Sequence, residues 1–394
     1  MTPSARTQAA IDLLDEIIAA ARDNGSAADH IAKRFFAGRR YAGSKDRRAV
    51  RELVWRAIRA FGERPVNGRA AMVALADVDA ALADCFDGSG YGAAAITPDE
   101  PRAATALLPA WLSGQFAAPV DEAEQRALME RAPLDVRVNT LLADRDAVMA
   151  EIPEAQALAL PDALRLPTDF VLDNHAAFNR GLIEVQDYGS QLIVAACEAK
   201  PGKTVLDLCA GAGGKTLALA AAMQSKGQLI ASDTNRNRLD QLRLRVQRAG
   251  ADFVEPLLLN PGKELVMMAE LVGYCDVVLV DAPCSGTGTW RRSPETRWRL
   301  NSARLKRVIE EQAKLLRIAA ELVAPRGCLV YAVCSVLDAE GKGQVDIFLN
   351  DNTGWEAEPI TSLPAGRVYG AGILLTPAHD NCDGFFFARM QKLL

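Results

Sequence analysis

The sequence predicts an α/β fold in which a mostly parallel sheet is preceded by a helical region and a small α/β segment. With 394 residues, the chain is too long for one ordinary domain. Its first third repeats apolar residues at helical spacing. From residue 200 onward, short apolar runs alternate with helical segments, which is typical of an open parallel sheet. We therefore expect three domains, at 1–133, 134–198 and 199–394.

Spacing and breaks define the elements before residue 200. Apolar residues recur every three or four positions over Ile11–Ile18 and Val50–Ile58, which predicts helices. The break at Pro65–Gly68 precedes an alanine-rich helical stretch. Leu134–Asn139 then alternates like a strand, and the amphipathic segment Asp144–Ile152 follows it.

The third domain alternates strands and helices. The predicted strands are Thr204–Leu208, Gln228–Asp233, Phe253–Leu259, Asp276–Asp281 and Cys328–Val333, with Gly384–Met390 as a closing strand. The predicted helices are Leu217–Met223, Arg238–Ala249 and Ser302–Val323. Because ligands of such sheets bind at the carboxyl ends of the strands, the informative residues are those that directly follow each strand.

The composition excludes several classes of protein. No run of about 18 apolar residues is present, so we expect no membrane span. Residues Met1–Asp12 lack the apolar core of a secretory signal. The eight cysteines include no C-x-x-C pair, which argues against a zinc site and against a disulfide framework. We therefore expect no metal and a reducing, cytoplasmic location.

The net charge of −5 hides an uneven distribution. Residues 1–70 and 289–317 each carry a net charge of +6, and residues 71–135 carry −8. The basic stretches favour contact with a polyanion, and solvated helix faces are the alternative explanation. Within the second stretch, the segment Trp290–Arg299 holds two tryptophans and four arginines, which either contact nucleic acid or anchor the segment.

A glycine-rich loop, Asp207–Thr216, follows the first strand of the sheet. It is not a phosphate-binding P-loop, because Cys209 stands where the first glycine must be. It is not a dinucleotide fingerprint either, because Thr216 occupies the last glycine position. A close backbone approach without pyrophosphate suits S-adenosylmethionine. Asp233 ends the second strand, where a carboxylate accepts hydrogen bonds from ribose hydroxyls.

Two cysteines follow neighbouring strands. Cys284 lies in the motif Asp281–Gly288, and Cys334 comes directly after the fifth strand. A single buried cysteine is usually packing, but two at adjacent strand ends place both thiols in one cleft. Carbon 5 of cytosine attacks a methyl sulfonium only after a thiolate has added at carbon 6. A carboxylic group at N3, which Asp281 supplies, balances the charge that develops on the ring.

Residues 134–394 resemble the RNA cytosine-C5 methyltransferases of the Nol/Nop/Sun class, in particular the bacterial RsmB type that methylates small-subunit ribosomal RNA. The matching segments are Val185–Asp187, Asp207–Thr216, Asp281–Gly288, Tyr331–Ser335 and Asp383–Ala388. The helical first domain, with Lys45–Val54, resembles the NusB-like RNA-binding domain that RsmB-type enzymes carry. The resemblance implies a Rossmann-like class I methyltransferase sheet, preceded by a small α/β subdomain and an all-α NusB-like domain.

The same resemblance implies roles for individual residues. Cys334 is expected to be the nucleophile, Cys284 to assist product release, and Asp281 to take part in catalysis. The expected contacts to the cofactor, S-adenosylmethionine, are Cys209, Ala210, Gly211, Ala212, Gly213, Gly214, Lys215, Asp233, Asn260 and Asp281. The implied product is 5-methylcytosine in RNA, with 16S ribosomal RNA as substrate and partner, and we expect a monomer.

The chain departs from the family pattern in the cofactor region. Gly211 and Ala212 replace the Ala-Pro of the usual Cys-Ala-Ala-Pro-Gly-Gly-Lys loop, which loosens the turn. Asn260 replaces an aspartate near the adenine amino group, so any hydrogen bond there lacks a full charge. These changes bear on cofactor affinity and leave the cysteine chemistry intact.

Three alternatives remain open at this stage. The substrate is transfer RNA instead of ribosomal RNA, the chain methylates DNA or another base on the same fold, or it is a non-catalytic RNA-binding assembly factor. A DNA enzyme attacks with the cysteine of its Pro-Cys pair, here Cys284, so it has no need of Cys334. An assembly factor binds no cofactor and has no reason to keep two reactive thiols.

Overall fold

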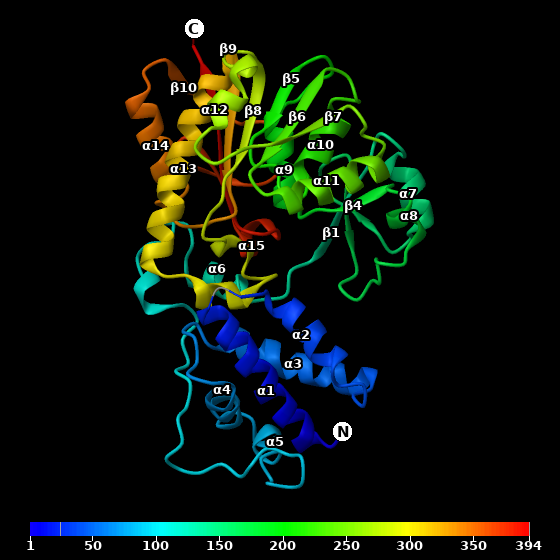
Figure 1. Ribbon diagram of the computed structural model, residues 1–394, viewed down its shortest axis with the longest axis vertical. Coiled ribbons are helices and arrows are strands. Elements are labelled where there is room, and N and C mark those ends of the chain that lie inside the picture. The colour runs from blue at the N-terminus through cyan, green and yellow to red at the C-terminus, as the bar shows by residue number, and fades with distance from the viewer. Residues whose placement is uncertain (24, 394) are drawn as a thin grey trace. The chain divides into compact units, whose positions relative to one another are not determined.

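The computed structural model describes residues 1–23 and 25–393 and divides into two compact units (Figure 1). Unit 1 comprises Met1–Phe116, Asp121–Arg131 and Thr289–Ser302. Unit 2 holds the remaining segments, which begin at Ala117, Ala132 and Ala303. The segment 289–302, which the sequence placed in the third domain, therefore groups with the helices of unit 1.

Unit 1 is helical, as its apolar spacing predicted. Its helices are α1 (Pro3–Arg22), α2 (Ala28–Ala37), α3 (Ser44–Ala60), α4 (Gly68–Ala76), α5 (Ala80–Ala83) and α6 (Glu122–Ala127). Helix α1 begins where Thr2 Oγ1 accepts a hydrogen bond from Ala5 N, with Pro3 in the first turn. Its buried face, which includes Leu14 and Ile17, packs against α3 and α4.

The segment 289–302 is built into the core of unit 1. Trp298 is buried, and its Nε1 donates to Phe61 O at 2.8 Å. Arg297 is 1% exposed and donates to the carbonyls of Ile58, Arg59 and Phe61 near the end of α3. Burial lowers the pKa of Arg297 to about 10, so its guanidinium remains charged at neutral pH. Of the two roles considered for this segment, the structure supports anchoring for both residues.

Unit 2 begins with a small antiparallel sheet in the order β2-β3-β1-β4. Its elements are β1 (Leu134–Val138), β2 (Gln156–Ala157), β3 (Ala163–Leu166), β4 (Ile183–Val185), α7 (Arg145–Glu151) and α8 (Ala176–Asn179). The strand and amphipathic helix predicted at residues 134–152 are both present. Val136 and Val138 of β1 are fully buried in a separate apolar cluster beneath this sheet.

A large sheet follows, with nine strands among the described residues and the main order β11-β12-β13-β9-β8-β5-β6-β7. Its strands are β5 (Thr204–Asp207), β6 (Gln228–Asp233), β7 (Val254–Leu258), β8 (Cys275–Asp281), β9 (Val323–Val333), β10 (Trp355–Ala357), β11 (Arg367–Tyr369), β12 (Gly372–Leu375) and β13 (Phe385–Lys392). All six predicted strands are present, although β9 begins at Val323 and not at Cys328. The predicted α/β class, with a Rossmann-like sheet and a helical N-terminal region, is confirmed.

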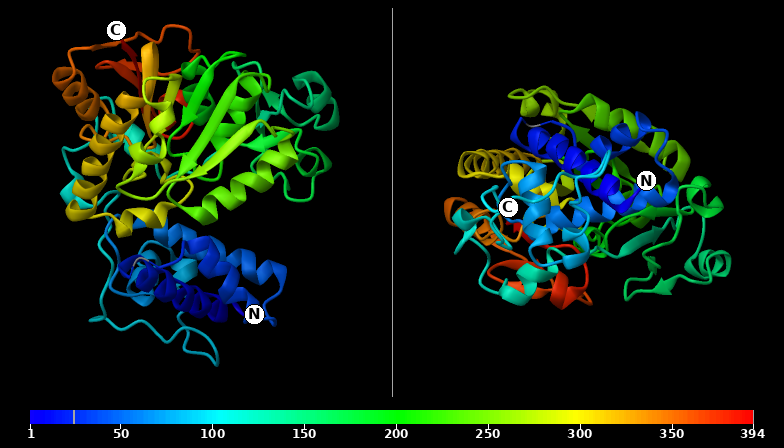
Figure 2. Two further views of the ribbon diagram at one scale, coloured as in Figure 1. Left: turned by 45° about the horizontal axis from the view of Figure 1, so that its top comes forward. Right: turned by 90° about the horizontal axis from the view of Figure 1, so that it is seen from below.

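Helices flank both faces of the large sheet. They are α9 (Tyr188–Cys197), α10 (Gly214–Ala222), α11 (Arg236–Ala249), α12 (Glu264–Met267), α13 (Ser302–Leu322), α14 (Lys342–Asp351) and α15 (Pro377–Asp380). Figure 1 shows α9, α10 and α11 on one side of the sheet and α13 and α14 on the other. The left view of Figure 2 shows the strands from green (β5 to β7) through yellow and orange to red (β13).

The order of the parallel strands reverses between β5 and β8. The chain runs outward from β5 through β6 to β7, and β8 then returns to pair with β5 on its other side. Such a reversal opens a crevice at the carboxyl ends of the two strands, because the connections leave in opposite directions. Leu208 directly follows β5 and Ala282 directly follows β8, so these two residues lie on either side of the crevice.

Among the residues that the structure describes, no helix combines the length and apolar character needed to cross a membrane.

Replacing Arg297 by alanine should destabilise unit 1 strongly, since it removes a donor from four carbonyls, including Leu107 O at 3.2 Å, of which Phe61 O keeps a second donor in Trp298. We expect a loss of about 2–4 kcal/mol in the free energy of unfolding, measured by urea denaturation of the full chain. The matched control is Arg40→Ala, which removes an exposed arginine of the same unit. Equal stability of the two variants would contradict the anchoring role.

Candidate active site

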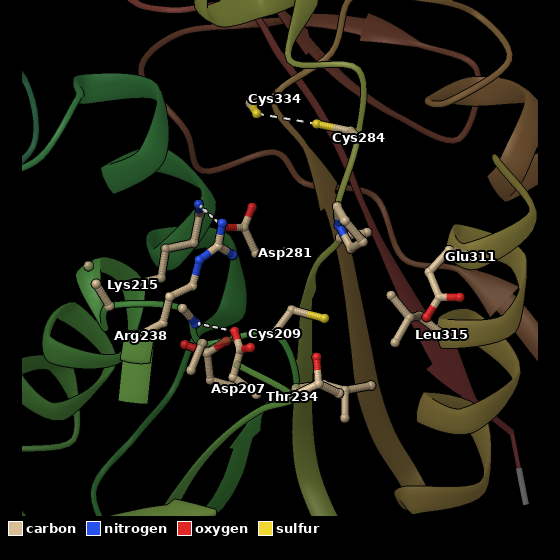
Figure 3. Close-up of a pocket in the computed structure, with 18 of the residues that line it drawn as sticks. Asp207, Cys209, Lys215, Thr234, Arg238, Asp281, Cys284, Glu311, Leu315 and Cys334 are labelled. Carbon is tan, nitrogen blue, oxygen red and sulfur yellow. Dashed lines mark hydrogen bonds and ion pairs between the residues drawn. The ribbon is translucent and has the colours of Figure 1, made fainter. Parts of the chain in front are cut away.

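The carboxyl ends of β5, β6, β8 and β9 surround a cavity of about 760 Å³ in unit 2. This volume lies within the range of roughly 300–1,000 Å³ that small-molecule sites occupy. In Figure 3, Cys284 and Cys334 lie at one end of the cavity, and Glu311 and Leu315 of α13 form the wall opposite Lys215. The two thiols therefore share one cavity with polar side chains such as Lys215 and Asp281 (Figure 3).

The glycine-rich loop between β5 and α10 forms the floor of the cavity. Gly211 has a φ of +57° and donates its N–H to Asp233 Oδ2 at 2.9 Å, which ties this loop to the end of β6. At Gly213, with a φ of +87°, a Cβ atom would lie 2.1 Å from Leu242. The carbonyl of Ala212 accepts a hydrogen bond of 2.8 Å from Arg245. A bond from α11 therefore restrains the turn that lacks the usual proline.

A buried carboxylate, Asp207, faces the cavity from the end of β5. Its Oδ2 accepts from Thr216 Oγ1 at 2.7 Å, whereas its Oδ1 has no hydrogen-bond partner among the described residues. Burial raises the pKa of Asp207 to about 7, and the Thr216 hydroxyl opposes that rise. An unpartnered acceptor in a polar cavity is suited to a cationic ligand group.

An ion pair lies between this floor and the thiols. Lys215 Nζ is 2.6 Å from Asp281 Oδ2. Burial by itself lowers the pKa of Lys215, but the negative charge of Asp281 outweighs it and raises that pKa above its ordinary value. The lysine therefore keeps its proton, and the pair brings a proton donor and a carboxylate to the same part of the cavity.

The two cysteines meet because their strands are parallel neighbours. Asp281 of β8 stands opposite Ala332 of β9, and each chain then turns over the cavity. The sulfur atoms of Cys284 and Cys334 lie 3.2 Å apart. The hydrogen bond to Cys334 and burial raise the pKa of Cys284 well above its ordinary value. Cys284 therefore keeps its proton at neutral pH, and either sulfur can be the donor in the hydrogen bond between them.

Close backbone packing fixes the Cys284 loop. Gly288 donates its N–H to Cys334 O at 3.1 Å, and its own carbonyl accepts from Gly384 N at 2.8 Å. A Cβ atom on Gly288 would lie 1.9 Å from Gly384 O, so only glycine allows this approach. The loop after the first cysteine is therefore bonded to the strand end that carries the second.

Most of the residues predicted for the site line this cavity. They are Cys209, Ala210, Gly211, Ala212, Gly214, Lys215, Asp233, Asp281, Cys284 and Cys334. Gly213 and Asn260 are not among the lining residues. Gly213 instead packs beneath the loop, against Leu242. Asn260 is exposed, and its backbone N–H donates to Met267 Sδ at 3.2 Å.

The cavity also has lining residues that the prediction did not name. They are Ser190, Thr234, Arg238, Gln241, Leu259, Glu264, Arg304, Val308, Glu311 and Leu315, besides residues of the two motifs. Arg238 and Gln241 lie three apart on α11, and Glu311 and Leu315 lie four apart on α13, so each pair shares a helix face. This spacing was visible in the sequence, but nothing in it said which helix face meets the strand ends.

Asp207 should give the protein a characteristic pH dependence. Its pKa of about 7 in the folded chain exceeds the value of about 4 for an unfolded aspartate. The folded state therefore binds a proton that the unfolded state lacks, and this contribution to stability is lost as the pH rises from 4 through 7. Asp207→Asn should abolish the loss, measured as the free energy of unfolding in urea between pH 5 and pH 8.

The control for this pH series is Asp276→Asn, at the amino end of β8. The ion pair of Asp276 with Lys203 lowers the pKa of Asp276 in spite of its partial burial, so it stays ionised throughout this range. This control should keep the slope of the wild type. A slope as steep in Asp207→Asn as in the wild type would rule out the raised pKa of Asp207, since the other buried carboxyls contribute equally to both proteins.

Comparison with known proteins connects this geometry to one family. The family described as 16S rRNA methyltransferase RsmB/F matches residues 194–391. The probable ribosomal RNA small subunit methyltransferase B of Synechocystis is 34% identical over 301 residues, covering 72% of this chain. Ribosomal RNA small subunit methyltransferase B of Xanthomonas campestris is 32% identical over 293 residues, again 72% of this chain. The chain spans 66% of the length of each relative.

A solved structure agrees with this match. A methyltransferase homolog protein from Pyrococcus horikoshii superposes with a TM-score of 0.60 at 28% identity, covering 71% of this chain and 92% of that one. The aligned sequences and the Rossmann-like sheet indicate the same family of methyltransferases, and the cavity lies at the strand reversal where such sheets bind ligands. The chain belongs to the RsmB/F family of 16S rRNA methyltransferases.

Proposed function

We propose that this chain transfers a methyl group from S-adenosylmethionine to carbon 5 of a cytosine in RNA, with 16S ribosomal RNA as the substrate. The observation that carries the proposal is the pair of cysteine sulfurs, 3.2 Å apart, at the mouth of the cofactor-sized cavity. RNA as partner, a monomeric state and a cytoplasmic location remain predictions.

The residues of the cavity fit the cofactor. S-adenosylmethionine supplies an electrophilic methyl group on a positively charged sulfur and also carries an ammonium group. Asp207 Oδ1, buried and unpartnered among the described residues, is suited to accept a hydrogen bond from that ammonium. Asp233 is suited to the ribose hydroxyls, and the side chains of Leu259 and Leu315 offer apolar contact to a flat base.

The two thiols take the roles that the resemblance implies. Because the pKa of Cys284 is raised, Cys284 keeps its proton at neutral pH and is a poor attacking thiolate. Cys334, whose sulfur lies 3.2 Å away, is the nucleophile that adds to carbon 6 of cytosine. The Lys215–Asp281 pair stands beside the thiols and supplies a proton at ring nitrogen N3, where negative charge develops.

In the methyl transfer and the elimination that follows it, each bond that forms is matched by one that breaks. The electron pair that Cys334 pushes into the ring makes carbon 5 nucleophilic, and carbon 5 takes the methyl group as the methyl–sulfur bond breaks. Cys284 then loses its own proton to solvent and, as a thiolate, removes the proton from carbon 5. The released electron pair restores the double bond between carbons 5 and 6 and expels the Cys334 thiolate, and the N3 proton returns to the Lys215–Asp281 pair.

Formation of the adduct itself prepares Cys284 for its step as a base. The hydrogen bond to Cys334 is the largest cause of the raised pKa of Cys284. Once Cys334 is bonded to carbon 6 as a neutral thioether, this cause of the raised pKa of Cys284 is weakened, so that pKa falls. The thiol that stays protonated during attack is thereby able to ionise when a base is required.

Basic residues of unit 1 support RNA as the substrate. Lys33 on α2, Arg40 in the following loop, and Lys45 and Arg48 on α3 are exposed. Such side chains release counterions from phosphates, which favours binding to any RNA and does not select a sequence. The site sets the choice of base, because the target must leave its stack to reach the thiols.

Methyl transfer should depend on both cysteines in different ways. With labelled S-adenosylmethionine and RNA from a bacterial strain that lacks this protein, the wild type should produce labelled 5-methylcytidine. Cys334→Ala should lower the rate by roughly three orders of magnitude, because no other group activates carbon 5. Cys284→Ala should accumulate a covalent protein–RNA adduct, detected by denaturing gel electrophoresis.

The control variant is Cys275→Ala at the opposite end of β8, where a buried thiol with a pKa of about 12 has no role in the cavity. It should form the product and accumulate no adduct. Label in transfer RNA alone would correct the substrate, and label that persists in Cys334→Ala would point to attack by Cys284. No label together with no binding of cofactor would leave an RNA-binding assembly factor.

A further inference from the structure

A buried carboxylate, Glu340, lies behind the two cysteines in the turn that precedes α14. Its side chain is fully buried. Oε2 accepts hydrogen bonds from Ser335 Oγ at 2.5 Å and from Ser285 Oγ, and Oε1 accepts from Ser285 N at 2.7 Å. Gln312 of α13 adds a fourth bond, from its Nε2 to Oε1 at 2.9 Å. Glu340 thus joins three segments of unit 2 that are distant in sequence.

Two of these segments carry the cysteines. Ser285 directly follows Cys284, and Ser335 directly follows Cys334. The two hydroxyls also contact each other, with their Oγ atoms 3.2 Å apart. Since each serine is covalently joined to its cysteine, the position of Glu340 restricts both backbones at the points from which the thiols project.

Further bonds extend this arrangement around the loops. Thr287 Oγ1 lies 3.0 Å from Ser335 Oγ and accepts from Val336 N at 3.1 Å. Gln312 also donates to Pro283 O at 3.0 Å, so α13 holds the residue before Cys284. The loops therefore have bonded partners on both sides of each thiol, and Glu340 is the group shared by both.

The chemistry of this position requires a carboxylate. Four donors point at two oxygen atoms, and only an ionised carboxylate accepts from all of them. An amide in the same place offers one accepting oxygen and an NH2 group that itself donates. A buried charge is tolerated only when its lone pairs are satisfied, and here all the satisfying donors come from the cysteine loops and α13.

We propose that Glu340 is a positioning residue, which holds Ser285 and Ser335 together and thereby sets the separation of the Cys284 and Cys334 thiols. Its consequence for catalysis rests on the proposed function, because the nucleophile and the base must both reach one cytosine ring. The separation of the thiols is a property of the folded chain alone and is measurable without RNA or cofactor.

The first measurement uses disulfide formation between Cys284 and Cys334 to report how closely the two thiols are held. In a glutathione buffer, Cys284 and Cys334 lose two protons and two electrons to glutathione disulfide, which becomes two glutathione molecules. The fraction of Cys284–Cys334 disulfide, quantified by peptide mass spectrometry, gives the effective concentration of one thiol near the other. Glu340→Gln should lower that concentration by at least about tenfold, as the serine hydroxyls lose their shared acceptor.

A second measurement separates positioning from general damage. The pKa of Cys284 is raised first by its hydrogen bond to Cys334 and by burial, and the negative charge of Glu340 adds to this. Glu340→Gln removes that charge and loosens the contact of the thiols, so the pH profile of Cys284 alkylation by iodoacetamide should move to lower pH. A merely structural residue would not move this profile.

The matched control is Gln344→Met. Gln344 is also buried, four residues further along, and its side chain donates to Ile309 O of α13 at 2.9 Å. It should leave the effective concentration and the pH profile unchanged. If Glu340→Gln does not fold, Ser335→Ala takes its place, since it removes one hydroxyl from the same carboxylate and keeps the charge.

The outcomes distinguish this inference from the proposed function. A tenfold loss in Glu340→Gln or Ser335→Ala, with none in Gln344→Met, supports positioning even if the wild type transfers no methyl group. Unchanged effective concentration in the folded Glu340 and Ser335 variants overturns positioning, even if the wild type methylates RNA. Equal losses in Gln344→Met would also overturn it, because the effect would then be general loosening around α14.

Discussion

The parallel pairing of β8 with β9 is the constraint on which the candidate site depends. The hydrogen-bond ladder places Asp281 opposite Ala332, so the chains that leave the two strands start side by side. Cysteines 50 positions apart in sequence therefore meet at 3.2 Å. A shift of one residue in this register would turn the end of β9 over and direct Cys334 to the opposite face of the sheet. The thiol chemistry thus rests on backbone bonds that involve neither thiol.

The sequence was most informative where structure is local. The apolar runs located the strands, and the residues after them, such as Cys284, were found because strand ends share an edge. Asn260 follows a strand as well, yet its backbone bonds to Met267 and the side chain stays outside the cavity. Arg297 and Glu340 are buried charges, whose partners come from distant segments that no periodic pattern reveals. What the sequence missed is the path of the loops and the partners of buried polar groups.

The distribution of charge resolves an apparent conflict between an acidic chain and the anionic substrate proposed for it. The cavity is lined by the carboxyl groups of Asp207, Asp233, Asp281 and Glu311, and Asp281 forms an ion pair with the half-buried Lys215. These groups suit a cationic methyl donor. Exposed lysines and arginines stand elsewhere, on α2 and α3 of unit 1. The net charge of −5 is therefore an average over an acidic cavity and a basic surface, and it describes neither of them.

The interleaving of the two units has a consequence for the order of folding during synthesis. The helices of unit 1 leave the ribosome first, but the carbonyls at the end of α3 find their guanidinium donor only when residues 289–302 have been made. By then the strands β5 to β8 have also emerged. More than half of the chain separates these carbonyls from their donor, so the final packing of unit 1 depends on a segment that is made long after its helices.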